Sequence, residues 1–365
     1  MIRHIPQSFR ARAGQAKSAK EIYALVTEAS PSEFQDPLAV STLYAQFGKF
    51  HRHCQLSQDK TNVVLSKLAT LDTSFTTPSS LVQSIYGMSL LECKSFPKSW
   101  QEQIVGLDLQ LVMFPDLVKL VKSFAMLQRR QQMEDVDRVA GELLKRRGEL
   151  AQAPMTHLTS LLSSLALLPE LTPNGTQLAD LVWWEVELQQ AKLRQELIPD
   201  LLCSAGKLGF GKRSECALDL ELINHKMDGV KSPVLVANWA LGLSYFAQVK
   251  PSGFAVVGQN IAKRKLNEFV LVDLIKIHLA FQRKQVKDVQ FEHRWWQLLR
   301  NRKVLEEKVE VRDSEFGFAQ ALELVLLHAR QISPSPPYQL WDDLAFVAKG
   351  NLKSASPGQL AMLLE

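Results

Sequence analysis

The sequence has few cysteines and no long apolar run. Its four cysteines, Cys54, Cys93, Cys203 and Cys216, form no Cys-x-x-Cys pair. In a chain of 365 residues they are too few for a disulfide framework, so a reducing compartment is expected. The longest apolar stretch, Ser160 to Leu168, is far shorter than the roughly 20 residues that span a bilayer. We therefore expect no transmembrane segment.

Strand patterns are also lacking. Sustained alternation of apolar and polar residues, which marks half-buried strands, is absent, and Val309-Glu310-Val311 is too short to count. Apolar residues instead recur at three- and four-residue steps along most of the chain, as on one face of an α-helix. The sequence therefore predicts an all-α protein.

The two stretches that resemble a phosphate-binding or metal-binding motif each lack a residue that the motif requires. The stretch from Gly206 to Lys212 has the glycine and lysine spacing of a phosphate-binding loop, but Arg213 stands where that loop needs Ser or Thr. His51, His53 and Cys54 cluster at the end of a predicted helix, yet a zinc site needs three or four ligands. We therefore expect no enzyme activity, no cofactor and no metal.

One helical hairpin, from Leu193 to Val230, is the clearest unit of the sequence. An apolar helix is followed by Gly209 and Gly211, which are expected to supply the positive φ that ends a helix. Ser214 is expected to cap the returning helix. A helix-ending corner therefore explains these glycines without a nucleotide.

Similar hairpins recur from residue 21 to residue 365. The equivalent positions in their first helices are Leu43, Ile85, Leu120, Leu161, Leu201, Ala240, Ile275 and Leu322. Their spacing of 35 to 47 residues is too irregular for repeats of fixed length. The pattern predicts a single α-solenoid of about eight irregular two-helix repeats, because stacked hairpins bury apolar faces that one hairpin leaves open.

The first 20 residues contain no acidic residue. Arg3, Arg10, Arg12, Lys17 and Lys20 are basic and are mixed with apolar and hydroxylated residues. This composition is typical of a mitochondrial targeting segment. The alternative is a basic tail that contacts RNA or another acidic partner.

Clusters of basic residues recur near predicted helix ends, in a chain with a formal net charge of +5. Aligned on one edge, they would form a stripe that matches a phosphate backbone. The alternative is a set of solvated helix ends that complement their own dipoles. The candidate RNA-binding residues are Arg129, Arg130, Lys145, Arg146, Arg147, Lys212, Arg213, Lys263, Arg264, Lys265, Arg283, Lys284, Arg300, Arg302 and Lys303.

Two tryptophan pairs, Trp183-Trp184 and Trp295-Trp296, lie in predicted second helices. Adjacent residues point about 100° apart on a helix. One member of each pair can therefore be buried while its neighbour faces a groove or an interface. An exposed tryptophan can stack on a base, but packing between repeats or against another subunit is the preferred interpretation.

The run Leu201-Leu202-Cys203-Ser204-Ala205-Gly206-Lys207-Leu208-Gly209-Phe210 resembles the "LLxAxAKLGF" helix ends of organellar helical-repeat proteins. These are the octotricopeptide, heptatricopeptide and FAST-kinase-like kinds. Ser204 and Gly206 depart from the pattern, which has alanine there, and no C-terminal RAP domain follows. The resemblance implies action on RNA in mitochondria or plastids.

These observations lead to two expectations for function. The first is a non-catalytic RNA-binding solenoid of the mitochondrial matrix, a subunit of a mitochondrial ribosome that contacts ribosomal RNA and neighbouring proteins. The second is a protein scaffold or an accessory subunit of a respiratory or other mitochondrial complex.

Overall fold

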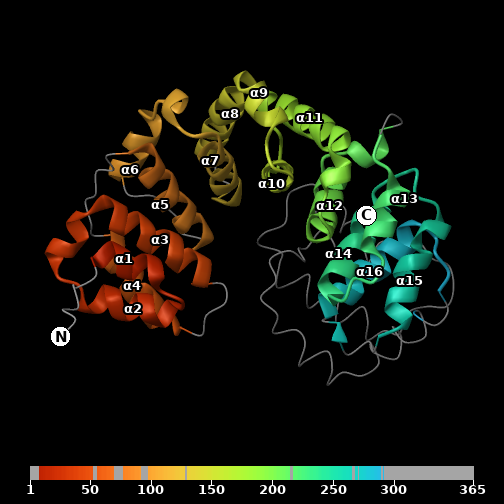
Figure 1. The fold of residues 1–365 in the computed structure, drawn as a ribbon, viewed down its shortest axis with the longest axis horizontal. Coiled ribbons are helices and arrows are strands. Elements are labelled where there is room, and N and C mark those ends of the chain that lie inside the picture. The colour runs from red at the N-terminus through yellow and green to blue at the C-terminus, as the bar shows by residue number, and fades with distance from the viewer. Residues whose placement is uncertain are drawn as a thin grey trace, which may run out of the picture. The chain divides into compact units, whose positions relative to one another are not determined.

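The all-α prediction is confirmed for the part of the chain that the structure describes. The computed structural model describes residues 8–51, 56–69, 77–91, 98–127, 130–213, 217–264, 268–269, 271–288 and 291. Within these ranges it has sixteen α-helices, several short 3-10 helices and no strand (Figure 1). No helix in the same ranges is long and apolar enough to cross a membrane.

The first helices of seven predicted hairpins lie where their apolar spacing places them. They are α3 (Pro37–His51), α5 (Pro78–Leu90), α7 (Phe114–Leu127), α10 (Met155–Leu165), α12 (Ile198–Lys207), α14 (Pro233–Ser244) and α16 (Leu271–Arg283). The equivalent residues Leu43, Ile85, Leu120, Leu161, Leu201 and Ala240 are at most 1% exposed. The first-turn prolines of α3, α5 and α14 help to set where these helices begin, since proline is well tolerated there.

The second helices are α4 (Gln58–Ala69), α6 (Lys98–Val105), α8 (Arg130–Lys145), α11 (Pro173–Leu188), α13 (Leu220–Met227) and α15 (Ala255–Ala262). One predicted boundary is wrong. Helix α13 begins at Leu220, where the Asp219 carboxylate accepts the amides of Glu221 and Leu222, and not after Ser214. Ser214 itself, the partner helix of α16 and the eighth hairpin lie outside the described residues.

Two compact units divide the chain, residues 1–192 and 193–365. In the first unit, first helices of successive hairpins pack in sequence, α3 on α5, α5 on α7 and α7 on α10 (Figure 1). Helix α8 packs on α7 and α11. In the second unit, α12 packs on α14 and α14 on α16. One solenoid through both units stays a prediction.

The part of the basic N-terminal segment that the structure describes contributes to two helices. Helix α1 (Phe9–Gln15) is capped by Ser8, buries Phe9 and Ala13, and packs on α3. Helix α2 (Ala19–Glu28) packs on α3 and α4. Residues that resemble a targeting segment by composition therefore contribute to the first unit.

The glycine corner after α12 is a turn packed on the end of α14. Gly209 has a φ of 84°, as predicted, whereas the predicted positive φ at Gly211 is wrong. A Cβ atom on Gly211 would lie 2.6 Å from the carbonyl oxygen of Tyr245, so glycine is required there for close packing. The Gly211 carbonyl also accepts the amide of Ala247 at 2.8 Å. Because a helix and not a strand precedes these glycines, the segment is not built as a phosphate-binding loop.

Candidate nucleic-acid interface

Basic side chains in the first unit donate to backbone carbonyls that lie about one repeat earlier in the chain, at the end of another helix. We call these contacts inter-repeat ties. Lys67 in α4 donates from Nζ to the carbonyl oxygen of Val26 near the end of α2, at 2.7 Å. Arg138 in α8 donates to the carbonyls of Ile104 and Val105 at the end of α6, at 2.8 Å for Val105. Donor and acceptor are 33 to 41 residues apart in these ties, which is one repeat length.

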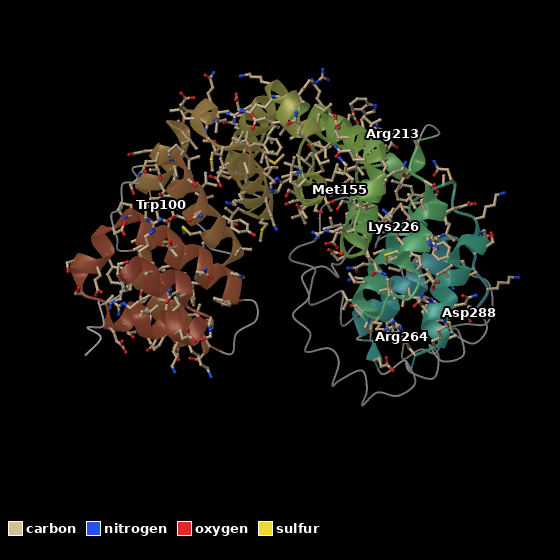
Figure 2. All side chains as sticks on the ribbon, viewed as in Figure 1. Trp100, Met155, Arg213, Lys226, Arg264 and Asp288 are labelled. Carbon is tan, nitrogen blue, oxygen red and sulfur yellow. The ribbon has the colours of Figure 1, made fainter. Side chains whose placement is uncertain are left out.

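The second unit contains the same kind of tie, made by Lys226 and Arg264, which are labelled in Figure 2. Lys226 in α13 donates to the carbonyl of Leu193 at 2.8 Å, across 33 residues. Arg264, just after α15, donates to the carbonyls of Val230 and Lys231, across 34 and 33 residues. The acceptor carbonyls of both ties lie in the segments that follow α11 and α13.

Helix dipoles explain the Lys67 and Arg138 ties, whose acceptor carbonyls lie in the last turns of α2 and α6. The last four carbonyls of a helix have no partner within it and carry partial negative charge. A cation that reaches them from the next repeat satisfies them and complements the dipole. A hydrogen bond to a charged group contributes about 1.5–3 kcal/mol. The ties therefore stabilise the stacking of neighbouring repeats.

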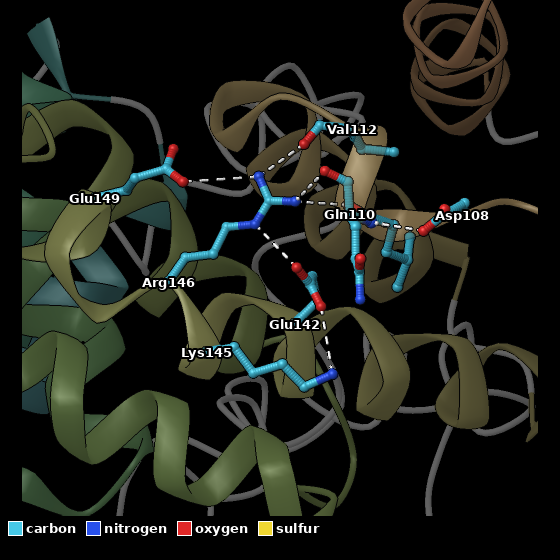
Figure 3. Close-up of polar contacts among 8 residues, drawn as sticks. Asp108, Gln110, Val112, Glu142, Lys145, Arg146 and Glu149 are labelled. Carbon is cyan, nitrogen blue, oxygen red and sulfur yellow. Dashed lines mark hydrogen bonds and ion pairs between the residues drawn. The ribbon is translucent and has the colours of Figure 1, made fainter.

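Arg146, just after α8, makes the most extensive tie (Figure 3). Its guanidinium donates to the carbonyls of Leu109 and Val112 at 2.8 Å each and to that of Gln110 at 2.9 Å. It also donates to the Glu142 carboxylate at 3.0 Å. The Arg146 side chain is only 15% exposed. The guanidinium therefore uses its hydrogen-bond donors within the protein, mainly on carbonyls at and beside the 3-10 turn Leu109–Leu111.

Arg283 and Lys284 at the end of α16 are also used internally. The Arg283 guanidinium lies over the Tyr245 ring, 4.5 Å from its centroid, and donates to the Ser244 hydroxyl at 3.2 Å. Lys284 donates to the carbonyl of Phe246, 38 residues earlier. Burial lowers the pKa of the Lys284 ammonium from its ordinary value. Both cations therefore pack on the end of α14.

The remaining candidates divide into exposed residues and residues outside the description. Lys145, Arg147, Lys212, Arg213 and Lys263 are exposed. Arg130 begins α8, but its side chain is not among those described. Arg129, Lys265, Arg300, Arg302 and Lys303 lie outside the described residues. The exposed cations occur in both units, so a single continuous stripe stays a prediction.

Sequence reasoning missed three of the tie residues, Lys67, Arg138 and Lys226, because each stands alone and not in a basic cluster. The signal that could have found them is spacing. Each lies 33 to 41 residues after the end of an earlier helix segment. A search for a cation one repeat after each predicted helix end would have included them.

The two residues of the Trp183-Trp184 pair differ in burial, as the helical geometry predicts. Trp183 is buried at 4% exposure, whereas Trp184 is 54% exposed. Trp295 and Trp296 lie outside the described residues. One exposed tryptophan therefore marks the outer face of α11.

His157 in α10 lies against the Phe114 ring, with centroids 6.2 Å apart. Desolvation, together with the charge of Lys119, lowers its pKa from the ordinary value. This histidine is therefore favoured in its neutral form, as a packed side chain.

No group of three or more His, Cys, Asp or Glu side chains suited to a metal occurs within the described ranges. No protein-family model matches the chain, and no curated protein matches it at a significant level. Any statement of function therefore depends on the helices and the charges described above.

Proposed function

We propose that the chain is a non-catalytic α-solenoid that binds RNA in mitochondria, as a structural subunit of a mitochondrial ribosome. The resemblance of residues 201–210 to organellar helical repeats supports the class of partner. The acid-free basic N-terminal segment supports the location. The sequential packing of α3, α5, α7 and α10, and of α12, α14 and α16, supports the solenoid.

The observation that carries the RNA proposal is a division of roles within the basic clusters. Arg146 is enclosed in a tie, whereas its neighbours Lys145 and Arg147 are exposed. Arg264 makes a tie, whereas Lys263 is exposed. A tie needs one cation, and the additional cations are exposed to solvent, where a phosphate backbone can reach them.

Salt dependence tests this proposal directly. The full-length chain is titrated into a fluorescein-labelled oligouridylate of about 20 nucleotides, and binding is followed by anisotropy. If all five exposed cations contact phosphates, the slope of log K against log salt approaches about −3.5, at about 0.7 per contact for single strands. Affinity then falls about a hundredfold between 50 and 200 mM salt.

Two charge-matched variants make the test specific. In the first, the five exposed candidates Lys145, Arg147, Lys212, Arg213 and Lys263 become Gln. In the second, five exposed lysines outside the clusters, Lys49, Lys60, Lys192, Lys231 and Lys250, become Gln. The first variant should bind more weakly with a flatter salt slope, and the second should keep the native slope. Absence of salt-dependent binding, or equal losses in both variants, would refute RNA binding at these residues.

The second candidate is a protein scaffold, an accessory subunit of a respiratory or other mitochondrial complex. The exposed Trp184 on α11 favours it, because a contiguous exposed apolar surface often marks a protein contact. A native assembly that contains the chain but no RNA would select this candidate.

A further inference from the structure

The outer face of α11 presents two large apolar side chains to solvent. Trp184 is 54% exposed and Leu188 is 62% exposed. They stand four residues apart, so they are neighbours on one face of the helix. Val182 and Val186 are buried on the opposite side, and Trp183, about 100° from Trp184, is buried as well. Helix α11 therefore has an inner apolar face, covered by the first unit, and a second one that faces outward.

Acidic residues border one side of this outer face. Asp180 lies one turn before Trp184, and Glu187 lies three residues after it. At 100° per residue, both fall on the same side of Trp184, whereas Leu181 and Leu188 fall on the other. We call Asp180, Leu181, Trp184, Glu187 and Leu188 the α11 outer face. Its centre is a tryptophan, with leucines on one side and carboxylates on the other.

The charges determine which partner suits this face. Carboxylates repel a phosphate backbone, so base stacking on Trp184 would place RNA against unfavourable charge. Tryptophan is enriched among the residues that dominate protein interfaces. An amphipathic helix with basic flanks would cover the apolar residues and also meet the carboxylates.

We propose that the α11 outer face binds a basic amphipathic helix of a partner protein. Apolar residues of that helix pack on Trp184 and Leu188, and its lysines or arginines lie near Asp180 and Glu187. The proposal is independent of RNA binding, because it uses different residues and a different ligand. Failure of the oligouridylate experiment therefore leaves it standing.

A pair of designed peptides tests the proposal. Each has about 18 residues, about five helical turns, with leucines at i, i+3, i+4 and i+7. One has lysine on the flanks of the apolar face, and the other has glutamate. Anisotropy of the labelled peptides with the full-length chain should show that the lysine peptide binds at least about tenfold more tightly.

Substitutions then locate the binding site. The double variant Trp184→Ala and Leu188→Ala should weaken the lysine peptide about thirtyfold, the loss typical of a strong interface residue. The control is Val234→Ala, which truncates an apolar residue of α14 that is 47% exposed and should leave affinity unchanged. Both variants should melt like the native chain, because exposed substitutions rarely alter stability.

Charge reversal provides a second readout that keeps the apolar residues. The double variant Asp180→Lys and Glu187→Lys should invert the preference and favour the glutamate peptide. Equal binding of the two peptides by the native chain would overturn the proposal, as would native affinity in the Trp184→Ala, Leu188→Ala variant. Loss of oligouridylate binding or of self-association in that variant, without loss of peptide binding, would identify RNA or a second copy as the occupant instead.

Discussion

Replacing Arg146 with methionine removes the most extensive inter-repeat tie while preserving an unbranched apolar side chain. The guanidinium loses its contacts with three carbonyls in residues 109–112. The change also leaves the Glu142 carboxylate, whose side chain is 9% exposed, without its closer cationic partner. We expect the first unit to be destabilised.

The magnitude follows from these contacts. Removing one partner of a buried ion pair costs about 3–5 kcal/mol, since the other charge is left uncompensated. Two features favour the lower end. Lys145 stays within 3.5 Å of Glu142, and water can replace the donor at the exposed Gln110. We therefore expect a loss of about 3 kcal/mol.

Hydrogen exchange of the full-length chain measures this loss locally. The amides of Leu111 and Val112 donate to the carbonyls of Asp108 and Leu109, within the turn that Arg146 holds. A change of about 3 kcal/mol corresponds to exchange about 150-fold faster, when the turn recloses faster than the open amides exchange. Urea denaturation of the same variant should show a lower midpoint for the first unit.

Lys145→Met is the matched control, because it removes the same charge from the adjacent residue. The Lys145 side chain is 73% exposed and approaches Glu142 only to 3.5 Å. Its loss should cost less than about 0.5 kcal/mol, as for exposed ion pairs. Equal exchange rates in the two variants, or a native rate in Arg146→Met, would refute the assignment of the tie as a stabilising contact.

Two further predictions concern packing and pH. Gly211→Ala should cost about 2 kcal/mol or more in urea denaturation, because its Cβ would meet the Tyr245 carbonyl. Gly209→Ala, strained but in open space, should cost only about 1 kcal/mol, and the reverse order would disprove the packing argument. The pKa of His157 is lower in the folded than in the unfolded chain, so its neutral form adds stability above about pH 6.5 that is lost as pH falls. His157→Gln should therefore make the urea midpoint change less between about pH 7 and 5.5. If the midpoint of this variant changes with pH as it does in the native chain, His157 is not the cause of the pH dependence.

The helices of the fold could be predicted because each carries its own signal. Proline in the first turn and apolar residues at three- and four-residue steps place α3, α5 and α14. The side-chain oxygen of Thr77 accepts the Ser80 amide at the start of α5, the contact typical of threonine just before a helix. Such signals are local, so they are read from a few neighbouring residues.

The roles of the basic residues could not be predicted, because they depend on distant parts of the chain. Within one cluster, the partly buried Arg146 donates to carbonyls 34 to 37 residues earlier, whereas Arg147 is exposed. The need for glycine at Gly211 arises likewise from Tyr245, on another helix segment. Recurrence of basic clusters therefore reflects both the cations in ties and the exposed cations, and the sequence alone does not separate them.

The most direct measurement of the RNA proposal is ultraviolet cross-linking of the protein purified from its native source, with RNA-linked peptides identified by mass spectrometry. Cross-links are expected at Lys145 and Arg147, at Lys212 and Arg213, and at Lys263. None is expected at Arg146, whose guanidinium is enclosed by its own carbonyl partners. A native assembly without RNA, or cross-links confined to other regions of the chain, would contradict the account.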